Sequence, residues 1–360
     1  MATVLPGLID SHTHILMGRK PGAVGAGWGE EILLRESWQY RTITALGNVK
    51  KDLEAGFTAM RDCGSLGTMY SDTDVRRAIN EGLVMGPRMQ VATIPLSGTG
   101  WLPEGGFSPE VTVPSAFRAV DSPEEGRKAV REEIKYGADL IKIFPGGTRS
   151  YFEPDGRLVV PASVTLEELE AIVDEAHRQG VKAACHAYGG VALDDSVEAG
   201  CNSIELGADF SDELAAKMAR KGIFAVMTLK HTEYWEEPEL KATHGKYCRV
   251  ALQKASLPRL MKAGVKIAFG TDAGTGPDHG SQATEFKYLV DYGMKPAQAL
   301  RSATALAAEL LGWQGRIGTI EKGKYADVIA VAGNPLDDIT EVERVKFVMK
   351  GGEVVRIDLK

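Results

Sequence analysis

The sequence of 360 residues lacks several features that would assign it to other classes of protein. Its fully apolar runs extend over only a few residues, far short of the ~20 that a membrane-spanning helix needs. Its formal charge is −7 and it has no basic block, which argues against nucleic acid or a membrane surface as a partner. The first residues carry no basic leader, so no secretory signal is expected. These absences favour a cytoplasmic protein of the size of an enzyme.

Cysteine is also scarce, and no C-x-x-C pair occurs. The four cysteines (Cys63, Cys185, Cys201 and Cys248) are scattered, whereas disulfide frameworks are typical of short secreted chains. We therefore expect reduced cysteines and no disulfide framework.

What the sequence does contain is an alternation of strand-like and helix-like segments, in a composition typical of globular proteins. Eight short β-rich runs lie at residues 5–10, 57–63, 88–94, 139–144, 181–187, 202–206, 223–228 and 265–271. Helices are predicted between several of them, with start signals at Ser122-Pro123 and at the capping box formed by Thr165 and Glu168. Eight alternating units predict a parallel (β/α)8 barrel of the TIM type. An open doubly wound sheet is the alternative, but no Gly-x-Gly-x-x-Gly motif follows an early strand.

The helical pattern stops near residue 311, and the last part of the chain has a different character. Short strands are predicted at 325–331, 346–349 and 353–357, with glycine-rich turns between them. We therefore divide the chain into a barrel of residues 1–314 and a small β-module of residues 315–360. Two long loops rich in glycine and proline, 95–121 and 145–164, follow barrel strands and are expected on the catalytic face.

Residues suited to metal chemistry occur where predicted strands end. His12 and His14 follow the first strand, and residues two apart in an extended chain point the same way, so both imidazoles can reach one ion. A lone His-x-His motif is weak evidence, because a pair of surface or core histidines would look the same.

Three further residues strengthen this interpretation, because the carboxyl ends of the strands meet at one rim of a barrel. Lys142 lies in an apolar strand, where a free cation is costly to bury unless a carboxylate partner neutralises it. His186 ends the fifth strand, and taken alone it would more often be a core histidine. Asp272 follows the eighth strand, where one oxygen can bind a metal and the other can accept a proton. A helix N-cap is the alternative role for Asp272.

These residues lie in motifs that resemble the amidohydrolase superfamily. The branch is that of the imidazolonepropionase-like enzymes and the metal-dependent Xaa-Pro dipeptidases (prolidases). The matching text is PGLIDSHTH at 6–14, IKI at 141–143, HAYG at 186–189, GTDAG at 270–274 and GTIEKGKYAD at 318–327. The resemblance extends from about residue 3 to the C-terminus.

The resemblance implies a (β/α)8 barrel with a divalent metal ion held by His12, His14 and Asp272. It also implies a carboxylated Lys142 that bridges to a second ion bound by His186. Carboxylation would turn the buried cation into an anionic oxygen ligand. Asp272 would be the catalytic general base, which takes a proton from the attacking water and passes it to the leaving amine. We expect zinc, although manganese and cobalt suit the same ligands.

The sixth strand departs from the family pattern Ser-Ile-Glu-His-Gly, in which the histidine completes the second metal site. This chain reads SIELG at 203–207, and Leu206 cannot coordinate a metal. Glu205 is a poor substitute, because strand alternation turns it away from the side of Leu206. We therefore expect either one tightly held ion, with His186 turned toward it, or a weak second site.

The start of the chain also differs from the family, whose members have several β-strands before the His-x-His motif. Only eleven residues precede His12 here. Because those strands pair with the C-terminal ones, we expect the β-module to be an incomplete β-sandwich with open edges. Either the start is truncated, or the module is completed in another way, such as by a neighbouring subunit in a homo-oligomer.

Three residues are candidates for substrate binding. His231, just past the seventh strand, could touch a substrate carbonyl or carboxylate, or it could be a solvated loop histidine beside acidic residues. His279 lies in the loop after Asp272 and matches a family position. Tyr188 lies two residues past His186 and is expected to line the same cavity.

The leading functional interpretation is a metal-dependent hydrolase of C–N bonds that acts on Xaa-Pro dipeptides or N-acyl amino-acid-like amides. A cyclic amidohydrolase or a deaminase with a single metal ion is the second possibility. The third is a catalytically impaired barrel that serves as a binding module, because Leu206 replaces the sixth-strand histidine. The retained polar residues speak against the third, since a site without a role has no physical reason to keep them.

Overall fold

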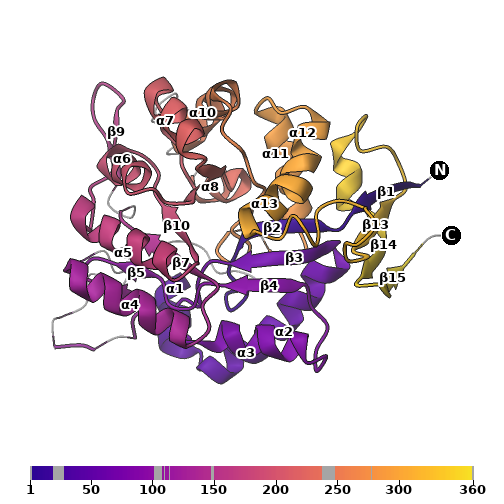
Figure 1. Ribbon diagram of the computed structural model, residues 1–360, viewed down its shortest axis with the longest axis horizontal. Helices are drawn as coiled ribbons and strands as arrows, with labels where there is room; N and C mark the ends of the chain where they lie inside the picture. The colour runs from indigo at the N-terminus through magenta and orange to yellow at the C-terminus, as the bar shows by residue number, and fades with distance from the viewer. Residues whose placement is uncertain are drawn as a thin grey trace.

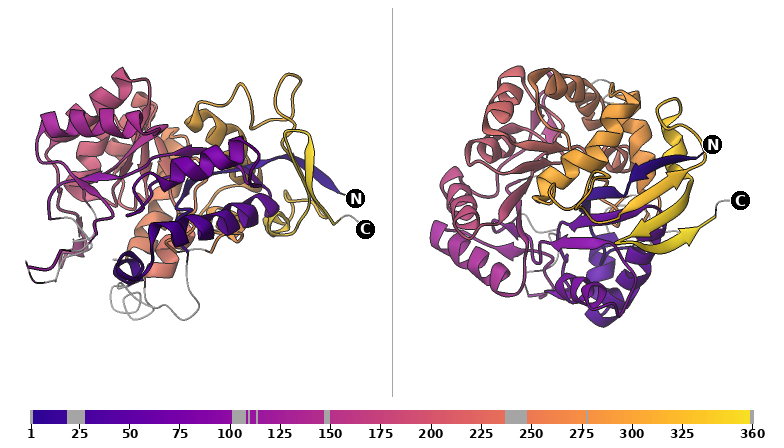
Figure 2. Two further views of the ribbon diagram at one scale, coloured as in Figure 1. Left: turned by 90° about the horizontal axis from the view of Figure 1, so that it is seen from below. Right: turned by 45° about the vertical axis from the view of Figure 1, so that its right-hand side comes forward.

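The computed structural model describes residues 2–18, 28–100, 108, 110–112, 114–146, 150–236, 248–276 and 278–358. Parts of the two predicted long loops lie outside the described residues. Parallel strands form a barrel with helices around it, and a small antiparallel sheet lies at one end (Figures 1 and 2). The predicted (β/α)8 barrel is confirmed.

The barrel strands belong to two parallel sheets that backbone contacts join into one. The first sheet contains β2 (Leu8–Thr13), β3 (Phe57–Asp62) and β4 (Arg88–Val91). The second has the order β12-β11-β10-β7-β5-β6, with β5 (Leu96–Ser97), β6 (Arg118–Ala119), β7 (Leu140–Phe144), β10 (Lys182–His186), β11 (Ser203–Glu205) and β12 (Phe224–Val226). The Asp139 N–H donates to the Val91 carbonyl at 2.8 Å and joins the sheets on one side. Residues 265–273 close the other side, because Ile267 bridges to β12 and Ala273 bridges to β2.

Two predicted strands differ in detail from the structure. The run at 5–10 is divided into β1 (Thr3–Pro6) and β2 at Gly7. Gly7 lets the backbone approach the neighbouring strand closely, because a Cβ there would lie 2.1 Å from Thr58 Oγ1. The run at 265–271 carries single bridges to its neighbours instead of a continuous ladder, yet it occupies the eighth position of the barrel.

Helices surround the barrel, and the predicted start signals of two of them are confirmed. The Ser122 hydroxyl accepts from the Glu125 N–H, and Thr165 and Glu168 form a capping box. The α-helices are α1 (Trp28–Arg35), α2 (Trp38–Glu54), α3 (Ser71–Asn80), α4 (Pro123–Lys135), α5 (Leu166–Arg178), α6 (Gly190–Glu198), α7 (Asp212–Lys221), α8 (Leu229–Trp235), α10 (Arg249–Ala263), α11 (Glu285–Asp291), α12 (Pro296–Arg301) and α13 (Ala307–Leu311). Shorter elements are the 3₁₀ helices η2 (Gln282–Thr284) and η4 (Ile339–Glu343), the π-helix η3 (Ser302–Leu306), and the hairpin of β8 (Tyr151–Phe152) and β9 (Leu158–Val159).

The small antiparallel sheet has the order β1-β13-β14-β15. Its C-terminal strands are β13 (Val328–Val331), β14 (Val345–Lys350) and β15 (Glu353–Ile357), close to the predicted positions. β1 pairs with β13, so the beginning of the chain supplies a neighbour to the C-terminal strands (Figure 1). This pairing was not predicted. The division of the chain into domains at residue 314 stays a prediction.

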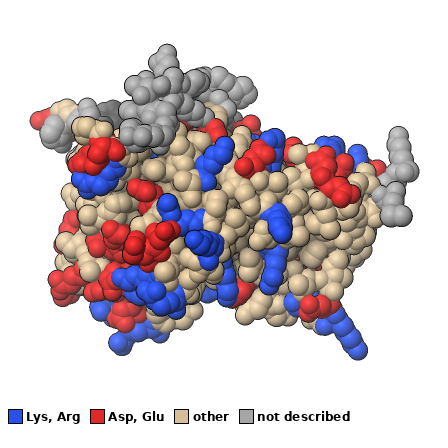
Figure 3. All heavy atoms as spheres, turned by 90° about the horizontal axis from the view of Figure 1, so that it is seen from above, with Lys and Arg blue, Asp and Glu red and all other residues tan. Residues whose placement is uncertain are grey.

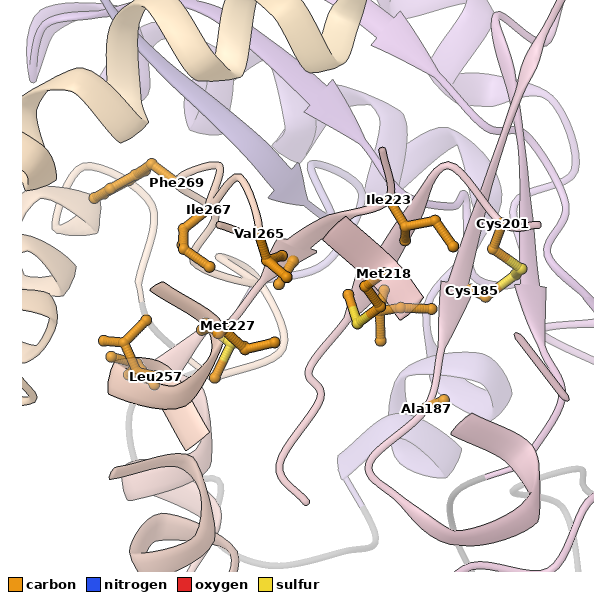
Figure 4. Packing of buried hydrophobic residues seen from close by; sticks show 14 of the residues in the cluster. Cys185, Ala187, Cys201, Met218, Ile223, Met227, Leu257, Val265, Ile267 and Phe269 are labelled. Carbon is orange, nitrogen blue, oxygen red and sulfur yellow. A yellow bond between two sulfur atoms is a disulfide. The ribbon is translucent and has the colours of Figure 1, made fainter. Parts of the chain in front are cut away.

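The expectation of no disulfide is wrong, because Cys185 and Cys201 are bonded to each other (Figure 4). Cys185 lies on β10 and points into the layer between barrel and helices, and Cys201 lies just before the neighbouring strand β11. The two Cα atoms are 6.1 Å apart, a normal distance for a disulfide. Sequence spacing missed the pair because the parallel pairing of β10 and β11 brings the two residues together. Cys63 and Cys248 are free.

The surface carries charged side chains of both signs. On the face in Figure 3, acidic and basic side chains are interspersed. None of the helices in the described ranges combines the length and apolar character that crossing a bilayer requires.

Candidate active site

The five predicted metal-site residues lie at the carboxyl end of the barrel. His12 lies one residue before the end of β2, His14 follows this strand, Lys142 lies within β7, His186 ends β10, and Asp272 lies in the eighth barrel segment. All five side chains are buried. The strand-end rule therefore brought these residues together, and their role as metal ligands stays a prediction.

Asp272 is at the centre of the cluster of histidines. Its Oδ1 lies 3.5 Å from His14 Nε2, and its Oδ2 lies 3.9 Å from His12 Nε2 and 3.5 Å from His231 Nε2. The ligand atoms of His12, His14 and Asp272 all lie within 4.8 Å of one another, so these three residues could hold a metal ion. Asp272 does not cap a helix.

The protonation states of this cluster suit a cation. Burial lowers the pKa of His14 to about 3 and the pKa of His231 to about 4, so both rings are neutral at pH 7. Burial opposes ionisation of Asp272, but the nearby His231, His12 and His14 hold the pKa of its carboxyl well below the usual range. A neutral imidazole and an ionised carboxylate are the forms that bind metals.

Left-handed backbone turns place side chains at the rim of the barrel. Leu206 and Thr228 follow β11 and β12, Asp272 lies near the end of the eighth segment, and their φ values are 62°, 44° and 59°. Such conformations are costly for residues other than glycine and concentrate at functional sites. Gly274 has φ +103°, and a Cβ there would lie 2.3 Å from the His14 carbonyl oxygen, so only glycine fits beside this ligand.

Lys142 is fully buried and has no carboxylate partner among the described residues. Its Nζ lies 3.2 Å from His12 Nε2 and 4.9 Å from the centre of the Phe144 ring. The Phe144 ring also stacks on the ring of His186, with the two centroids 4.6 Å apart. Within the described part of the chain, Lys142 therefore lacks the carboxylate partner that the sequence allowed.

The sixth strand contributes Glu205, which the sequence did not identify as a site residue. Glu205 Oε2 lies 2.7 Å from His12 Nδ1. The other oxygen lies 2.6 Å from the Arg61 guanidinium on β3. Burial opposes ionisation of Glu205, yet Arg61 and His12 hold the pKa of its carboxyl below the usual range. Leu206 itself is completely buried.

The three predicted substrate-binding residues have different surroundings. His231 is buried in α8 beside Asp272 rather than solvated, and its Nδ1 has no hydrogen-bond partner in the described residues. The ring of Tyr188 packs edge-on against the ring of His186, with centroids 4.7 Å apart. His279 contacts the His14 carbonyl at 3.3 Å through Nε2 and Asp52 at 2.8 Å through Nδ1. Through these contacts His279 supports the backbone of the metal-site residue His14.

Arg249, at the start of α10, is a further site residue that sequence reasoning missed. Its guanidinium lies 4.5 Å from the centre of the Tyr188 ring, and its charge affects the pKa of His231. Its Nε lies 3.8 Å from the carboxylate of Glu236. No motif surrounds Arg249 in the sequence, so only the fold reveals that it lies near the metal-site residues.

A barrel with histidines, a lysine and an aspartate at its carboxyl rim defines a class of metal-dependent hydrolases. Residues 3–355 match the model of the Amidohydrolase family, and the protein therefore belongs to that family. It is an enzyme, a metal-dependent hydrolase, and the family predicted from the motifs is confirmed.

Similar proteins include several hydrolases of amide bonds. An ochratoxinase from Aspergillus niger is 30% identical over 390 aligned residues, which cover 98% of this chain and 75% of the ochratoxinase. A structure of a Xaa-Pro dipeptidase with methionine bound in the active site has 31% identity and a TM-score of 0.84 over 98% of this chain and 86% of that one. A prolidase complexed with N-methylphosphonate-L-proline has 32% identity and a TM-score of 0.82 over 99% of this chain and 87% of that one.

Proposed function

We propose that this enzyme hydrolyses the amide bond of Xaa-Pro dipeptides or of N-acyl amino acids, with Asp272 as the general base. The position of Asp272 carries this proposal, because its two oxygens face different histidines at the barrel rim. One oxygen can share an ion with His12 and His14, while the other receives a proton from the attacking water and returns it to the leaving nitrogen. The similarity to a Xaa-Pro dipeptidase, a prolidase and an ochratoxinase supports the choice of substrates.

The residues at this rim fit a divalent ion, for which we propose zinc. His12, His14 and Asp272 supply two imidazoles and one carboxylate, a donor set that catalytic zinc sites use. When bound, the ion polarises the scissile carbonyl and lowers the pKa of water toward neutrality. Burial of all three side chains excludes competing water from the ligands.

We further propose that Lys142 carries a carboxyl group on Nζ. An uncharged or cationic amine at this position is buried without a carboxylate partner, 3.2 Å from a metal-site histidine. A carbamate would place an anion there, beside the ion, and would remove the cost of the isolated cation. Since Leu206 offers no ligand, a second ion would have only Lys142 and His186. The site should therefore hold one ion tightly.

The proposed substrates carry a carboxylate, and Arg249 is a suitable partner for it. Arginine forms bidentate, charge-assisted hydrogen bonds with carboxylates. Arg249 stacks on Tyr188 beside His186 and lies close enough to His231 to affect its pKa. We propose that Arg249 and Tyr188 bind the substrate carboxylate, and that His231 orients the carbonyl from its position beside Asp272.

One observation favours a second candidate function. Because Leu206 offers no ligand to a second ion, a single ion would also suit a cyclic amidohydrolase or a deaminase. His12, His14 and Asp272 could hold this ion, with His186 as a proposed fourth ligand. The retention of Lys142 argues for the first proposal, because its carbamate would lie beside the ion there, whereas an ion held by His12, His14, His186 and Asp272 has no need for it.

A substrate panel with added zinc tests the proposal. It contains Xaa-Pro dipeptides, N-acyl amino acids, lactams and aminated bases, with the Asp272→Asn variant as the matched control. We expect turnover of one of the first two groups and its loss in the variant. Turnover of lactams or aminated bases alone would favour the second candidate. Bound metal without any turnover would favour a binding role.

A further inference from the structure

The carboxylate of Glu205 is buried next to the metal-site residue His12 and has no part in the proposed mechanism. Glu205 lies on β11 with its side chain fully buried inside the barrel. Its Oε2 contacts His12 Nδ1 at 2.7 Å, on the side of the ring opposite to the nitrogen that faces Asp272. A carboxylate in this position needs its own explanation, because burying a charge is costly unless its contacts compensate.

The other oxygen of Glu205 is held by two donors. Arg61 on β3 reaches Oε1 at 2.6 Å, and the Ser203 hydroxyl donates to the same oxygen. Arg61 is fixed in turn, because it also donates to the Ser11 carbonyl and, at 3.1 Å, to Ser203 Oγ. Both oxygens of Glu205 are therefore engaged, and its carboxylate cannot rotate away from His12.

This arrangement determines which nitrogen of His12 is available to an ion. An ionised Glu205 only accepts hydrogen bonds, so His12 must donate from Nδ1. The lone pair then lies on Nε2, which faces Asp272 at 3.9 Å and Lys142 at 3.2 Å. His14 achieves the same result with a neutral acceptor, because its Nδ1 contacts the Gly64 carbonyl at 3.0 Å.

We propose that Glu205, clamped by Arg61, is a positioning residue that fixes the ring orientation and the tautomer of His12 for metal binding. Such outer partners of a ligating histidine typically contribute 10–100-fold to metal affinity. The inference rests on the proposed metal site, but it does not depend on which substrate the enzyme cleaves.

A second metal site is the alternative explanation for this cluster. Ligand atoms of His12, Cys63 and Glu205 also lie within 4.8 Å of one another. However, the Arg61 guanidinium lies 2.6 Å from the Glu205 carboxylate, where its positive charge would repel an ion. The hydrogen bond to Glu205 also occupies the only nitrogen of His12 on this side. The geometry therefore favours a hydrogen-bonded clamp over a metal site.

The test compares Glu205→Gln with Glu175→Gln. Glu175 is a matched control because its buried carboxylate also pairs with an arginine, Arg131 at 2.8 and 3.0 Å, but it lies on α5 outside the barrel. Metal-stripped protein is titrated with Co²⁺ in competition with a chromophoric chelator, and the visible spectrum of the cobalt protein is recorded. We expect Glu205→Gln to raise the Kd for Co²⁺ by about 10–100-fold and to change the spectrum. Glu175→Gln should stay within about twofold of the wild type.

A second measurement uses the unchanged protein, so it does not depend on the folding of a variant. Nitrogen-15 NMR of the metal-free wild type reports which nitrogen of His12 carries the proton, and we expect Nδ1. An Nε2-protonated ring, or an unchanged Kd and spectrum in Glu205→Gln, would overturn the inference. If no tested dipeptide is cleaved while both results hold, the proposed substrate fails and the role of Glu205 stands.

Discussion

Leu206 is where this chain departs from the metal-binding pattern of its family, and replacing it with histidine should add a second metal ion. The position is completely buried and has φ 62°, in the left-handed region. Histidine adopts this conformation more readily than leucine does, so the backbone already suits the substitution. The introduced imidazole would be the third ligand beside Lys142 and His186, the number that catalytic zinc sites use.

The expected change in the free energy of unfolding follows from what Leu206 contributes to the stability of the wild type. A fully buried leucine side chain stabilises the fold by about 1.5–3 kcal/mol, and a bulky residue in the left-handed region costs on the order of 1 kcal/mol. We therefore expect metal-free Leu206→His to be about 0.5–2 kcal/mol less stable than the wild type. A second zinc ion at about one hundred times its Kd would contribute about 2.7 kcal/mol and reverse the order of the melting temperatures.

The assay is elemental analysis after removal of loose metal, together with the Tm of both proteins with and without zinc. We expect one tight equivalent in the wild type and two in Leu206→His. Leu193→His, at another buried leucine on α6 away from the barrel rim, is the control and should stay at one. Two tightly bound zinc equivalents in the wild type would refute the single-ion account. A folded Leu206→His variant that binds only one zinc equivalent would refute the role given to this position.

Three further predictions follow from individual contacts. Arg249→Gln should raise the KM for Xaa-Pro dipeptides by about 10–100-fold, the equivalent of a charged hydrogen bond of about 1.5–3 kcal/mol. The KM for the same dipeptides with an amidated C-terminus should not change. An equal rise of KM for both kinds of substrate would contradict carboxylate binding. Replacing Cys185 and Cys201, which are 16 residues apart, with serine should lower the free energy of unfolding in urea by about 3 kcal/mol, whereas no change would mean that the disulfide does not form in solution. Hydrogen bonds from Arg131 lower the pKa of Glu175 from 4.5 to about 2, so this pair stabilises the fold above about pH 4.5 and the stabilisation is lost as the pH falls toward 2. Acid unfolding, monitored by tryptophan fluorescence, should therefore depend less on pH between about 4.5 and 2 in Glu175→Gln than in the wild type. An unchanged curve would contradict the pairing.

Much of the fold and the metal-site residues could be predicted because they depend on local patterns. The eight strand-like runs and the capping signal at Thr165 each involve only a few neighbouring residues. The rule that strand ends meet at one rim then placed His12, Lys142 and Asp272 together without any distance information. That rule works here because the barrel closes, with the last segment bridging to both of its neighbours.

What could not be predicted depends on register between distant strands. Glu205 meets Arg61 across the barrel, 144 positions apart, and nothing in either local sequence indicates the contact. Arg249 lies over the ring of Tyr188, which is distant in the sequence, and β1 pairs with β13 near the other end of the chain. The disulfide of Cys185 was missed for the same reason. Each of these contacts is a property of the assembled barrel.

The most direct test of the account is the rate of proline release from Xaa-Pro dipeptides by zinc-loaded wild type and Asp272→Asn, expressed per bound zinc. Removal of a general base typically lowers the rate by about 10²–10⁴-fold. We predict measurable hydrolysis by the wild type, a loss of that size in Asp272→Asn and a similar Tm for both. Equal rates per bound zinc in the two proteins would contradict the role of Asp272 as the general base.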